Sequence, residues 1–297
     1  MKKWIVACRL RTLPLALASV AMGGILTIPS GQFRLSVFLL CCLTTMLLQI
    51  LSNLANDYGD SIHGADHAGR KGPVRAVQSG VISSQQMKMA VVLCSLLSLI
   101  SGLWLLWVAL QGDLYRIAIW LVIGLASIAA AITYTAGKKP YGYMGLGDLS
   151  VLIFFGLVCV LGTTYMINGS WYWAGTAPAL ASGMLAMGVL NINNVRDIDS
   201  DRVAGKFSFP VRFGRKAAVR YHQVLLWGSL ILCAGFVLTL PDPSPVHFLF
   251  LAVIPVFHRI NRAVATLAPE QLDPWLKKMA LSALLFTLLF GAGLLLG

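Results

Sequence analysis

The chain has 297 residues, of which 58% are hydrophobic and only 11% are charged. A soluble domain carries roughly 25% charged residues, and a soluble fold of this length could not hide so much apolar surface. Composition therefore excludes an ordinary soluble enzyme, a disordered chain, a collagen and a secreted disulfide scaffold, and it predicts an all-α polytopic membrane protein.

Apolar stretches of about 20 residues, which is the length that crosses a bilayer as a helix, occur nine times along the chain. They cover about 14–30, 34–56, 87–110, 115–136, 147–167, 172–195, 219–240, 245–261 and 279–297. The eighth is short, contains Pro255 and follows a helix-breaking, proline-rich turn at 241–245. The sequence thus predicts nine transmembrane helices in a single membrane-embedded domain over 1–297.

Basic residues predict the orientation of these helices. All of the 23 Lys and Arg except Arg34 and Arg116 fall in the N-terminal segment or after the second, fourth, sixth and eighth spans. The positive-inside rule makes that face cytoplasmic. We therefore interpret the net charge of +12 as membrane orientation rather than nucleic-acid binding, and expect a multi-pass protein of the inner (cytoplasmic) membrane with a cytoplasmic N-terminus.

Six of the 11 acidic residues lie in two short segments. The first is Asn53–Asp60, followed by Asp66, at the start of a region of about 53–88 that continues into a basic loop. The second is Asn191–Asp201, in a similar region of about 191–220. Each segment lies where a predicted helix meets a long loop on the basic face, and long loops in a compact fold are usually functional or disordered.

Within each segment the polar residues share one face of a helix. Residues three or four apart are neighbours on a helix, so Asn56 aligns with Asp60. Asn193, Asp197 and Asp201 form a matching stripe at i, i+4 and i+8. The spacing Asn-x3-Asp therefore occurs twice.

Basic residues follow both acidic segments in the same order. Arg75 stands as far after Asp60 as Arg212 stands after Asp197, and Lys71 and Lys206 supply further cations. We interpret the two regions as a pseudo-repeat, in which a helix with an acidic end is followed by a basic loop. Transport and catalytic bundles often contain such repeats.

This donor set suits a phosphorylated substrate. Carboxylate and amide oxygens are the ligands of Mg²⁺, which is commonly bound through one or two carboxylates plus substrate phosphates. Lys and Arg neutralise the remaining phosphate charge. Solvation of helix ends would explain a lone Asp at a membrane edge, but two matched clusters favour a pocket for a metal-bridged diphosphate.

These segments resemble those of the UbiA-type superfamily of intramembrane aromatic prenyltransferases, whose two aspartate-rich motifs read approximately NDxxDxxxD and DxxxD. The matching residues are Asn56-Asp57-x2-Asp60 for the first motif and Asp197-x3-Asp201 for the second. The last aspartate of the first motif would fall at Gly64, and Asp66 stands two residues later. Within the superfamily the chain looks like the members that prenylate 1,4-dihydroxy-2-naphthoate in menaquinone synthesis. The segments that carry this likeness are 11–14, 53–60, 72–80, 134–148 and 193–206.

The resemblance implies nine helices enclosing a central cavity open to the cytoplasmic side. It implies Mg-dependent transfer of a polyprenyl chain from polyprenyl diphosphate to the naphthoate, with loss of CO₂ and diphosphate. Two Mg²⁺ ions would bridge the diphosphate. The implied metal ligands are Asp57, Asp60, Asp66, Asp197 and Asp201. The residues implied to hold the diphosphate are Asn56, Asn193, Lys71, Arg75, Lys139, Lys206 and Arg212. Tyr134 would face the carbocation or position the acceptor ring.

Several alternatives stay open. Tyr134 at a helix end is also typical of an interfacial anchor. Arg11 marks a helix start, and a contact to the acceptor's carboxylate is the second interpretation of this residue. Another aromatic acceptor such as 4-hydroxybenzoate would use the same aspartates. A cation-coupled transporter would also have a pseudo-repeat and intramembrane polar groups, but no charged residue falls near the middle of any predicted span.

Overall fold

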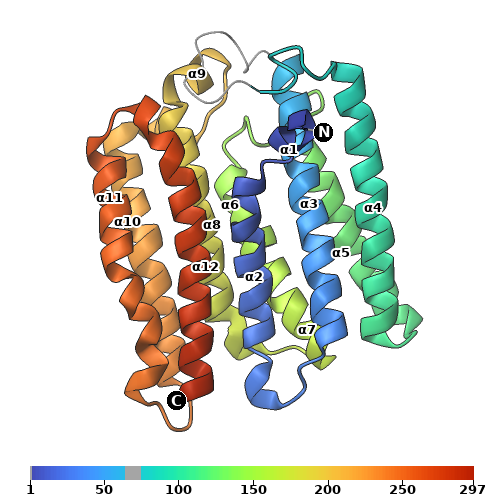
Figure 1. The fold of residues 1–297 in the computed structure, drawn as a ribbon, viewed down its shortest axis with the longest axis vertical. Coiled ribbons are helices and arrows are strands. Elements are labelled where there is room, and N and C mark those ends of the chain that lie inside the picture. The colour runs from blue at the N-terminus through green and yellow to red at the C-terminus, as the bar shows by residue number, and fades with distance from the viewer. Residues whose placement is uncertain (1, 64–74) are drawn as a thin grey trace.

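The computed structural model of the chain is an all-helical bundle, and it describes residues 2–63 and 75–297 (Figure 1). Within these ranges nine helices are long and apolar enough to cross a membrane. The prediction of an all-α polytopic membrane protein is therefore confirmed, and so is the number of spans.

The helices follow one another along the chain in three parts. The first part contains α1 (Lys2–Ala7), the 3₁₀ turn η1 (Leu10–Thr12), α2 (Leu13–Ile25), η2 (Ile28–Ser30), α3 (Leu35–Ile62), α4 (Ser84–Leu110) and α5 (Leu114–Thr133). The middle contains α6 (Gly147–Val151), the π-helical η3 (Leu152–Leu161), α7 (Gly162–Asn168), η4 (Trp173–Gly175), α8 (Thr176–Arg196) and α9 (Ile198–Val203). The last part contains α10 (Phe209–Leu238), η5 (Pro245–Val253), α11 (Ile254–Thr266), η6 (Pro269–Leu272) and α12 (Asp273–Leu296).

Three helices extend further than hydropathy predicts, all at the end of the bundle that carries the acidic segments. The α3 helix continues to Ile62 rather than 56, α10 begins at Phe209 rather than 219, and α12 begins at Asp273 rather than 279. Polar residues end an apolar stretch but do not break the helical hydrogen bonds, so the helices project beyond their apolar spans. The projecting end of α3 carries the first acidic segment on helical backbone, and the second lies on the end of α8 and on α9.

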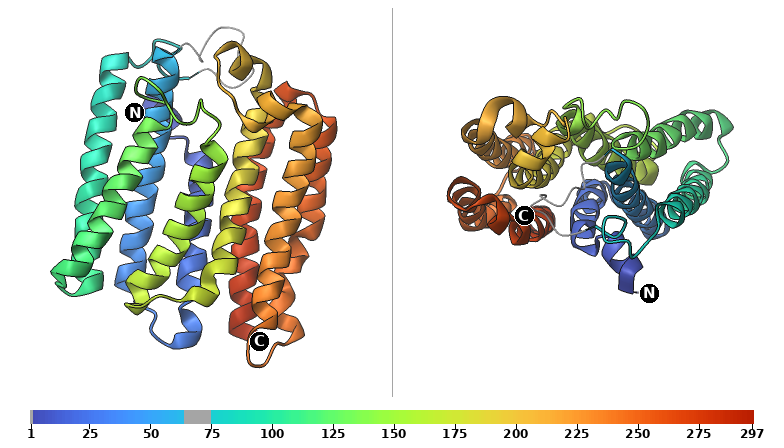
Figure 2. Two further views of the ribbon diagram at one scale, coloured as in Figure 1. Left: turned by 180° about the vertical axis from the view of Figure 1, so that it is seen from behind. Right: turned by 90° about the horizontal axis from the view of Figure 1, so that it is seen from above.

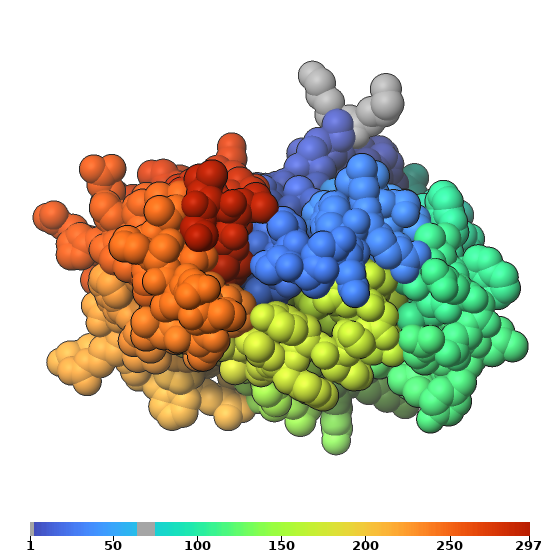
Figure 3. Space-filling model, turned by 90° about the horizontal axis from the view of Figure 1, so that it is seen from below, coloured from blue at the N-terminus to red at the C-terminus, as the bar shows by residue number. Residues whose placement is uncertain are grey.

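The bundle has two groups of helices joined through its centre. On one side α3 packs against α4 and α5, and on the other α10 packs against α8 and α11. The α12 helix packs against α2 and η5, so the first and last membrane spans lie side by side, as the views from above and from below also show (Figures 2 and 3). The α8 helix contacts η3, α10 and α12 and is the most buried span. The second acidic segment therefore ends the central helix of the fold.

Large apolar side chains cover the outside of the bundle. Trp104, Trp107, Val122 and Ile231 are all more than half exposed, on α4, α5 and α10. In water such a surface would drive association, whereas in lipid it costs nothing. The outer surface therefore matches the membrane location that composition predicts.

The close packing of α8 on η3 depends on small residues. A Cβ atom at Gly156 would lie 2.7 Å from the carbonyl oxygen of Ala179 and 3.1 Å from the Cα of Gly183. Small residues at such crossings let helix backbones approach in membrane bundles. Gly156 thus fixes how η3 lies against the central helix.

We expect Gly156→Ala to lower the stability of the protein in detergent by about 1–3 kcal/mol, because the added methyl group overlaps backbone atoms. Gly235→Ala on α10 is the matched control, since a Cβ there has no neighbour within 4 Å. It should leave stability unchanged or raise it by up to about 1 kcal/mol through helix propensity. Thermal unfolding followed by circular dichroism measures both, and equal melting temperatures would contradict this packing.

Candidate functional site

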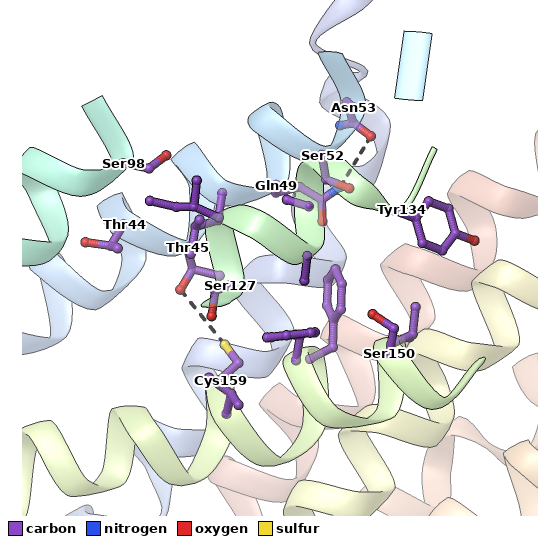
Figure 4. A pocket seen from close by; sticks show the side chains of 18 of the residues that line it. Thr44, Thr45, Gln49, Ser52, Asn53, Ser98, Ser127, Tyr134, Ser150 and Cys159 are labelled. Carbon is purple, nitrogen blue, oxygen red and sulfur yellow. Dashed lines mark hydrogen bonds between the residues drawn. The ribbon is translucent and has the colours of Figure 1, made fainter. Parts of the chain in front are cut away.

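A cavity of about 370 Å³ lies between the two groups of helices, and its walls come from α2, α3, α4, α5, η3 and α8 (Figure 4). It follows α3 from Asp60 to Cys41, a length of roughly 28 Å at 1.5 Å per residue. Its lining is polar where the acidic segments lie and mainly apolar beyond, with scattered hydroxyl groups. The polar lining includes Asn53, Asn56, Asp60, Arg75, Tyr134, Asn193 and Lys206, and the hydroxyl groups include those of Thr44, Thr45, Ser98, Ser127 and Ser150.

Asp60 is the centre of the first acidic segment. Its side chain is buried and accepts a hydrogen bond from the Tyr143 hydroxyl at 2.8 Å, while its other oxygen is paired with Arg75. Arg75 also donates to the backbone carbonyl of Asn56 at 2.8 Å. The acidic end of α3 and the first basic loop are thus in contact through Asp60 and Arg75.

Local geometry brings the loop after α5 against this helix end. A Cβ at Gly59 would lie 2.5 Å from the carbonyl carbon of Thr135, so only glycine allows this approach. The Thr135 hydroxyl then hydrogen-bonds to the Asn56 side-chain oxygen at 3.0 Å and to the Ala55 carbonyl at 3.1 Å. The loop after α5 therefore holds the Asn56 side chain on the cavity wall.

Asp57, next to Asn56, points elsewhere. Its carboxylate is 1% exposed and accepts hydrogen bonds from the backbone N–H groups of Ala76 and Val77, at 3.2 and 3.3 Å. It is not among the residues that line the cavity. In this structure Asp57 anchors the loop that carries Arg75.

The second acidic segment is organised by Arg196, a fully buried arginine. It donates to both oxygens of Asp197 at 2.7 and 2.8 Å, to the side-chain oxygen of Asn193 at 2.8 Å and to Asp273 at 2.6 Å. Asp273 in turn accepts a hydrogen bond from Arg11 at 2.7 Å. The network therefore joins the end of α8 to the start of α12 and to the N-terminal segment.

Asp201 lies one turn further along, on α9, and faces Lys206. The Lys206 ammonium lies 3.3 Å from the Asp201 carboxylate, which also accepts a hydrogen bond from the Ser208 hydroxyl at 3.3 Å. Lys206 lines the same cavity as Asp60 and Arg75. The first acidic segment thus brings Asp60 and Arg75 to the cavity. The second brings Lys206, whereas its partner Asp201, like Asp197, is not among the residues that line the cavity.

Burial shifts the titration of the groups at this end. It raises the pKa of Asp201, although the Lys206 charge opposes the shift. For Lys206 burial acts to lower the pKa, but the negative charges around it, first that of Asp201, outweigh burial and raise the pKa. Lys206 therefore stays cationic at neutral pH.

Tyr134 lies on the wall of the cavity, at the end of α5 (Figure 4). Its ring packs edge-on against Tyr141 with a centroid distance of 5.4 Å, and glycine at 147 leaves room for its hydroxyl. Burial raises the pKa of Tyr134 to about 12, so it is a neutral phenol at physiological pH. Its ring faces the cavity rather than a membrane interface.

The structure does not bring every predicted residue to the cavity. Arg212 is exposed and donates to the carbonyl groups of Phe207 and Met144, at 3.0 and 2.6 Å, while Lys139 is exposed and does not line the cavity. Asp66 and Lys71 lie outside the described residues. The assignments of these four residues stay predictions.

Sequence reasoning missed two residues that complete the site. Tyr143 and Asp273 contact the acidic segments from positions far away in the chain, 83 residues from Asp60 and 77 from Arg196. No local spacing could have found them. The one available signal is that Asp273 is among the few acidic residues outside the two segments.

The carboxylates suit a metal that shares its ligands with a substrate. No group of three or more His, Cys, Asp or Glu side chains is placed to hold an ion by itself within 2–63 and 75–297. Asp60, Asp197 and Asp201 instead each contact a cation and supply hard oxygen atoms from two helix ends. This arrangement fits Mg²⁺, which binds through one or two carboxylates with phosphate oxygens completing its shell.

Comparisons with known proteins agree with this geometry. The profile of the UbiA prenyltransferase family matches residues 16–289. The chain is 46% identical to 1,4-dihydroxy-2-naphthoate octaprenyltransferase of Escherichia coli (strain K12), over 99% of this chain and 95% of that protein. It is 43% identical to the protein of the same name from Haemophilus influenzae, over 100% of this chain and 97% of that protein.

Solved structures show the same fold at low identity. A UbiA homolog from Aeropyrum pernix K1 superposes with a TM-score of 0.68 at 20% identity, covering 97% of this chain and 98% of that one. A UbiA homolog from Archaeoglobus fulgidus bound to DMAPP and Mg²⁺ gives a TM-score of 0.63 at 17% identity, covering 99% of this chain and 100% of that one. The arrangement of the helices is therefore a known one.

The buried network predicts how removal of Arg196 affects stability. Arg196→Met should destabilise the protein by about 3–5 kcal/mol, because it removes the buried guanidinium group that both Asp197 and Asp273 contact. Arg116→Met is the control, since its pair with Asp113 is more than one-third exposed and such pairs contribute less than about 1 kcal/mol. Chemical unfolding in detergent compares the two, and similar losses would refute the role assigned to the buried network.

Proposed function

The chain belongs to the UbiA prenyltransferase family, and from this we propose that it transfers a polyprenyl chain from polyprenyl diphosphate to 1,4-dihydroxy-2-naphthoate. The reaction releases diphosphate and CO₂ and gives demethylmenaquinol. The observation that carries the proposal is a cavity lined at one end by Asp60, Arg75 and Lys206, the last paired with Asp201 behind it, whose remaining wall is mostly apolar. The acceptor follows from the names of full-length relatives at 43–46% identity.

Both parts of the donor substrate have a match in this cavity. The diphosphate would lie at the polar end, where Arg75 and Lys206 hold its negative charge and the side-chain oxygens of Asn56 and Asn193 assist. Lys71, Lys139 and Arg212 are proposed to add charge from the loops around this end. The polyprenyl chain would extend along the apolar wall between α3, α5 and η3.

Mg²⁺ would be held by Asp60, Asp197 and Asp201, with Asp57 and Asp66 as further proposed ligands. When bound, the metal supplies positive charge that lowers the energy of the leaving diphosphate. Carboxylates on two separate helix ends fit two ions, one at each acidic segment. For ligation, Asp60 and Asp201 would release their present partners, so that Arg75 and Lys206 become available to the phosphate oxygens, while Asp197 would keep its contacts with Arg196.

The residues of the cavity account for the chemical step. The bond between the allylic carbon and the diphosphate oxygen breaks, and its electron pair leaves with the diphosphate that Arg75 and Lys206 hold. The neutral ring of Tyr134 faces the resulting allylic cation, and apolar walls keep water from it. The electron-rich ring of the acceptor forms the new carbon–carbon bond, and its carboxylate leaves as CO₂, which restores aromaticity.

We further propose that the end of the bundle with the acidic segments faces the cytoplasm, in the inner membrane. The Lys and Arg residues, except Arg34 and Arg116, belong to this end by sequence, and the positive-inside rule orients it inward. A soluble naphthoate then reaches the site from the cytoplasm, while the prenyl donor enters from the bilayer.

Product analysis tests the activity directly. Detergent-purified protein given Mg²⁺, a polyprenyl diphosphate and an equal mixture of the naphthoate and 4-hydroxybenzoate should yield prenylated naphthalenediol that has lost its carboxylate. Mass spectrometry identifies the product, and trapped CO₂ should match it mole for mole. Prenylated hydroxybenzoate as the main product would overturn the acceptor assignment, and no prenylated product would overturn the activity.

Substitutions in both acidic segments test the metal and diphosphate site. Asp60→Asn and Asp201→Asn should each lower turnover roughly 100- to 1,000-fold, because a neutral amide no longer supports the metal that stabilises the leaving group. Asp199→Asn is the matched control, since Asp199 lies on the same short helix as Asp201 but is exposed. EDTA should abolish wild-type turnover and excess Mg²⁺ restore it. Near-normal turnover of Asp60→Asn would contradict the assignment.

A further inference from the structure

We propose that Arg11 and Gln49 form the binding site for the aromatic acceptor, with Arg11 binding its carboxylate and Gln49 accepting a hydrogen bond from the neighbouring ring hydroxyl. The inference rests on the proposed function and names the chemical class of the acceptor, an aromatic carboxylate with a hydroxyl group on the adjacent carbon. Both residues line the cavity, close to the acidic segments.

The N-terminal segment is fixed to α3 at this place. Asn53 donates to the carbonyl oxygen of Cys8 and to the Thr12 hydroxyl, both at 3.0 Å. Gln49 donates to the same hydroxyl at 3.2 Å, and to the side-chain oxygen of Asn53 at 3.4 Å (Figure 4). Since Thr12 follows Arg11 in the chain, these bonds hold Arg11 at the cavity beside Gln49.

Arg11 presents one edge of its guanidinium group for binding. Its Nη1 donates to Asp273, whereas its Nε and Nη2 donate to no described residue, and its side chain is 32% exposed. The Nε–Nη2 edge is the geometry that binds a carboxylate through two parallel hydrogen bonds. The other cations in this part of the cavity, Arg75 and Lys206, are paired with the carboxylates of the two acidic segments.

Gln49 supplies the second, independent contact. Its Oε1 atom is buried and has no hydrogen-bond partner, although buried polar atoms normally have one. The orientation of the Gln49 amide is fixed by its two partners. The Thr12 hydroxyl donates its hydrogen to the Arg9 carbonyl, so it can only accept from Gln49, and the Asn53 side-chain oxygen is also an acceptor. The Gln49 nitrogen must therefore face both of them, which leaves Oε1 without a partner. A hydroxyl group on the acceptor ring satisfies Oε1.

The walls next to these two residues suit an aromatic ring. Leu15, Leu48 and Leu276 line this part of the cavity with apolar surface. Because Arg11 and Gln49 are joined through Thr12, the groups they bind belong on adjacent ring carbons. A para-hydroxy acid such as 4-hydroxybenzoate cannot place its carboxylate and hydroxyl at both residues in this way, whereas the 2-carboxylate and 1-hydroxyl of the naphthoate are adjacent.

Three inhibitors separate the two contacts. 1-Hydroxy-2-naphthoate has both groups, 2-naphthoate has only the carboxylate, and 1-naphthol has only the hydroxyl. Arg11→Ala should raise the inhibition constants of both carboxylates, and the acceptor KM, roughly 10- to 100-fold through loss of a bidentate charged contact. The constant for 1-naphthol and the KM for polyprenyl diphosphate should change less than about threefold. Arg11→Lys, which keeps the charge and the partner of Asp273, should give an intermediate rise for the carboxylates alone.

Lys3→Ala is the matched control, because Lys3 lies in the same segment and bonds to the carbonyl of Val81 away from the cavity; it should leave all constants unchanged. Gln49→Leu should raise the inhibition constants of 1-hydroxy-2-naphthoate and 1-naphthol but not that of 2-naphthoate. An equal rise in the inhibition constants of all three inhibitors in Arg11→Ala, or a rise in the KM for polyprenyl diphosphate, would overturn the site. Either result would show that Arg11 has a structural role.

Direct binding keeps this test separate from the proposed function. The fluorescence of 1-hydroxy-2-naphthoate reports its affinity for wild-type protein, Arg11→Ala and Arg11→Lys without turnover. Loss of affinity in Arg11→Ala supports the site even where wild-type protein fails to prenylate the naphthoate, and that failure would count against the proposed function alone. Unchanged affinity in Arg11→Ala would overturn the site while leaving the activity intact.

Discussion

The structure depends on pairing a few buried carboxylates with cations from other parts of the chain. Asp60, Asp197 and Asp201 are all at most 5% exposed, and each contacts an arginine or a lysine. A buried charge that loses its partner destabilises a protein by about 3–5 kcal/mol. The loops that carry Arg75 and Lys206 must therefore close over the helix ends for the chain to be stable, and closing them completes the polar end of the cavity.

Some of these ion pairs can exchange their partners when substrate binds, and others hold the site rigid. A diphosphate with bound Mg²⁺ brings negative oxygens for Arg75 and Lys206 and positive charge for the carboxylates, so every ion pair that opens is replaced by another of the same kind. The Asp197–Arg196–Asp273 contacts differ, because Arg196 uses Nε and both Nη atoms on Asn193, Asp197 and Asp273. That arginine is a fixed support between α8 and α12, whereas Lys206 makes a single longer contact at 3.3 Å.

The sequence predicts what depends on periodicity, and fails where a side chain's direction depends on distant segments. Nine spans and the shared face of Asn56 and Asp60 follow from helix geometry, whereas Arg75, expected from the resemblance to hold the diphosphate, is paired with Asp60 in the structure. The equal spacing of Arg212 suggests the same pairing in the second half, yet Arg212 bonds to backbone carbonyls and Lys206 contacts the acid instead. The helices repeat, but their loops fold against different neighbours, so a pseudo-repeat in the sequence does not extend to the contacts.

The few acids also determine the electrostatic field at this end of the bundle. With 23 basic and 11 acidic residues, of which six lie in the two acidic segments, the surrounding loops keep an excess of positive charge. A field of one sign around a low-dielectric cavity concentrates anions at its mouth and speeds their binding. Both proposed substrates are anions, a diphosphate and a carboxylate, and the proposed arrangement assigns them to different cations. Arg75 and Lys206 would hold the diphosphate and Arg11 the carboxylate, so the charge that attracts both substrates is also divided between them.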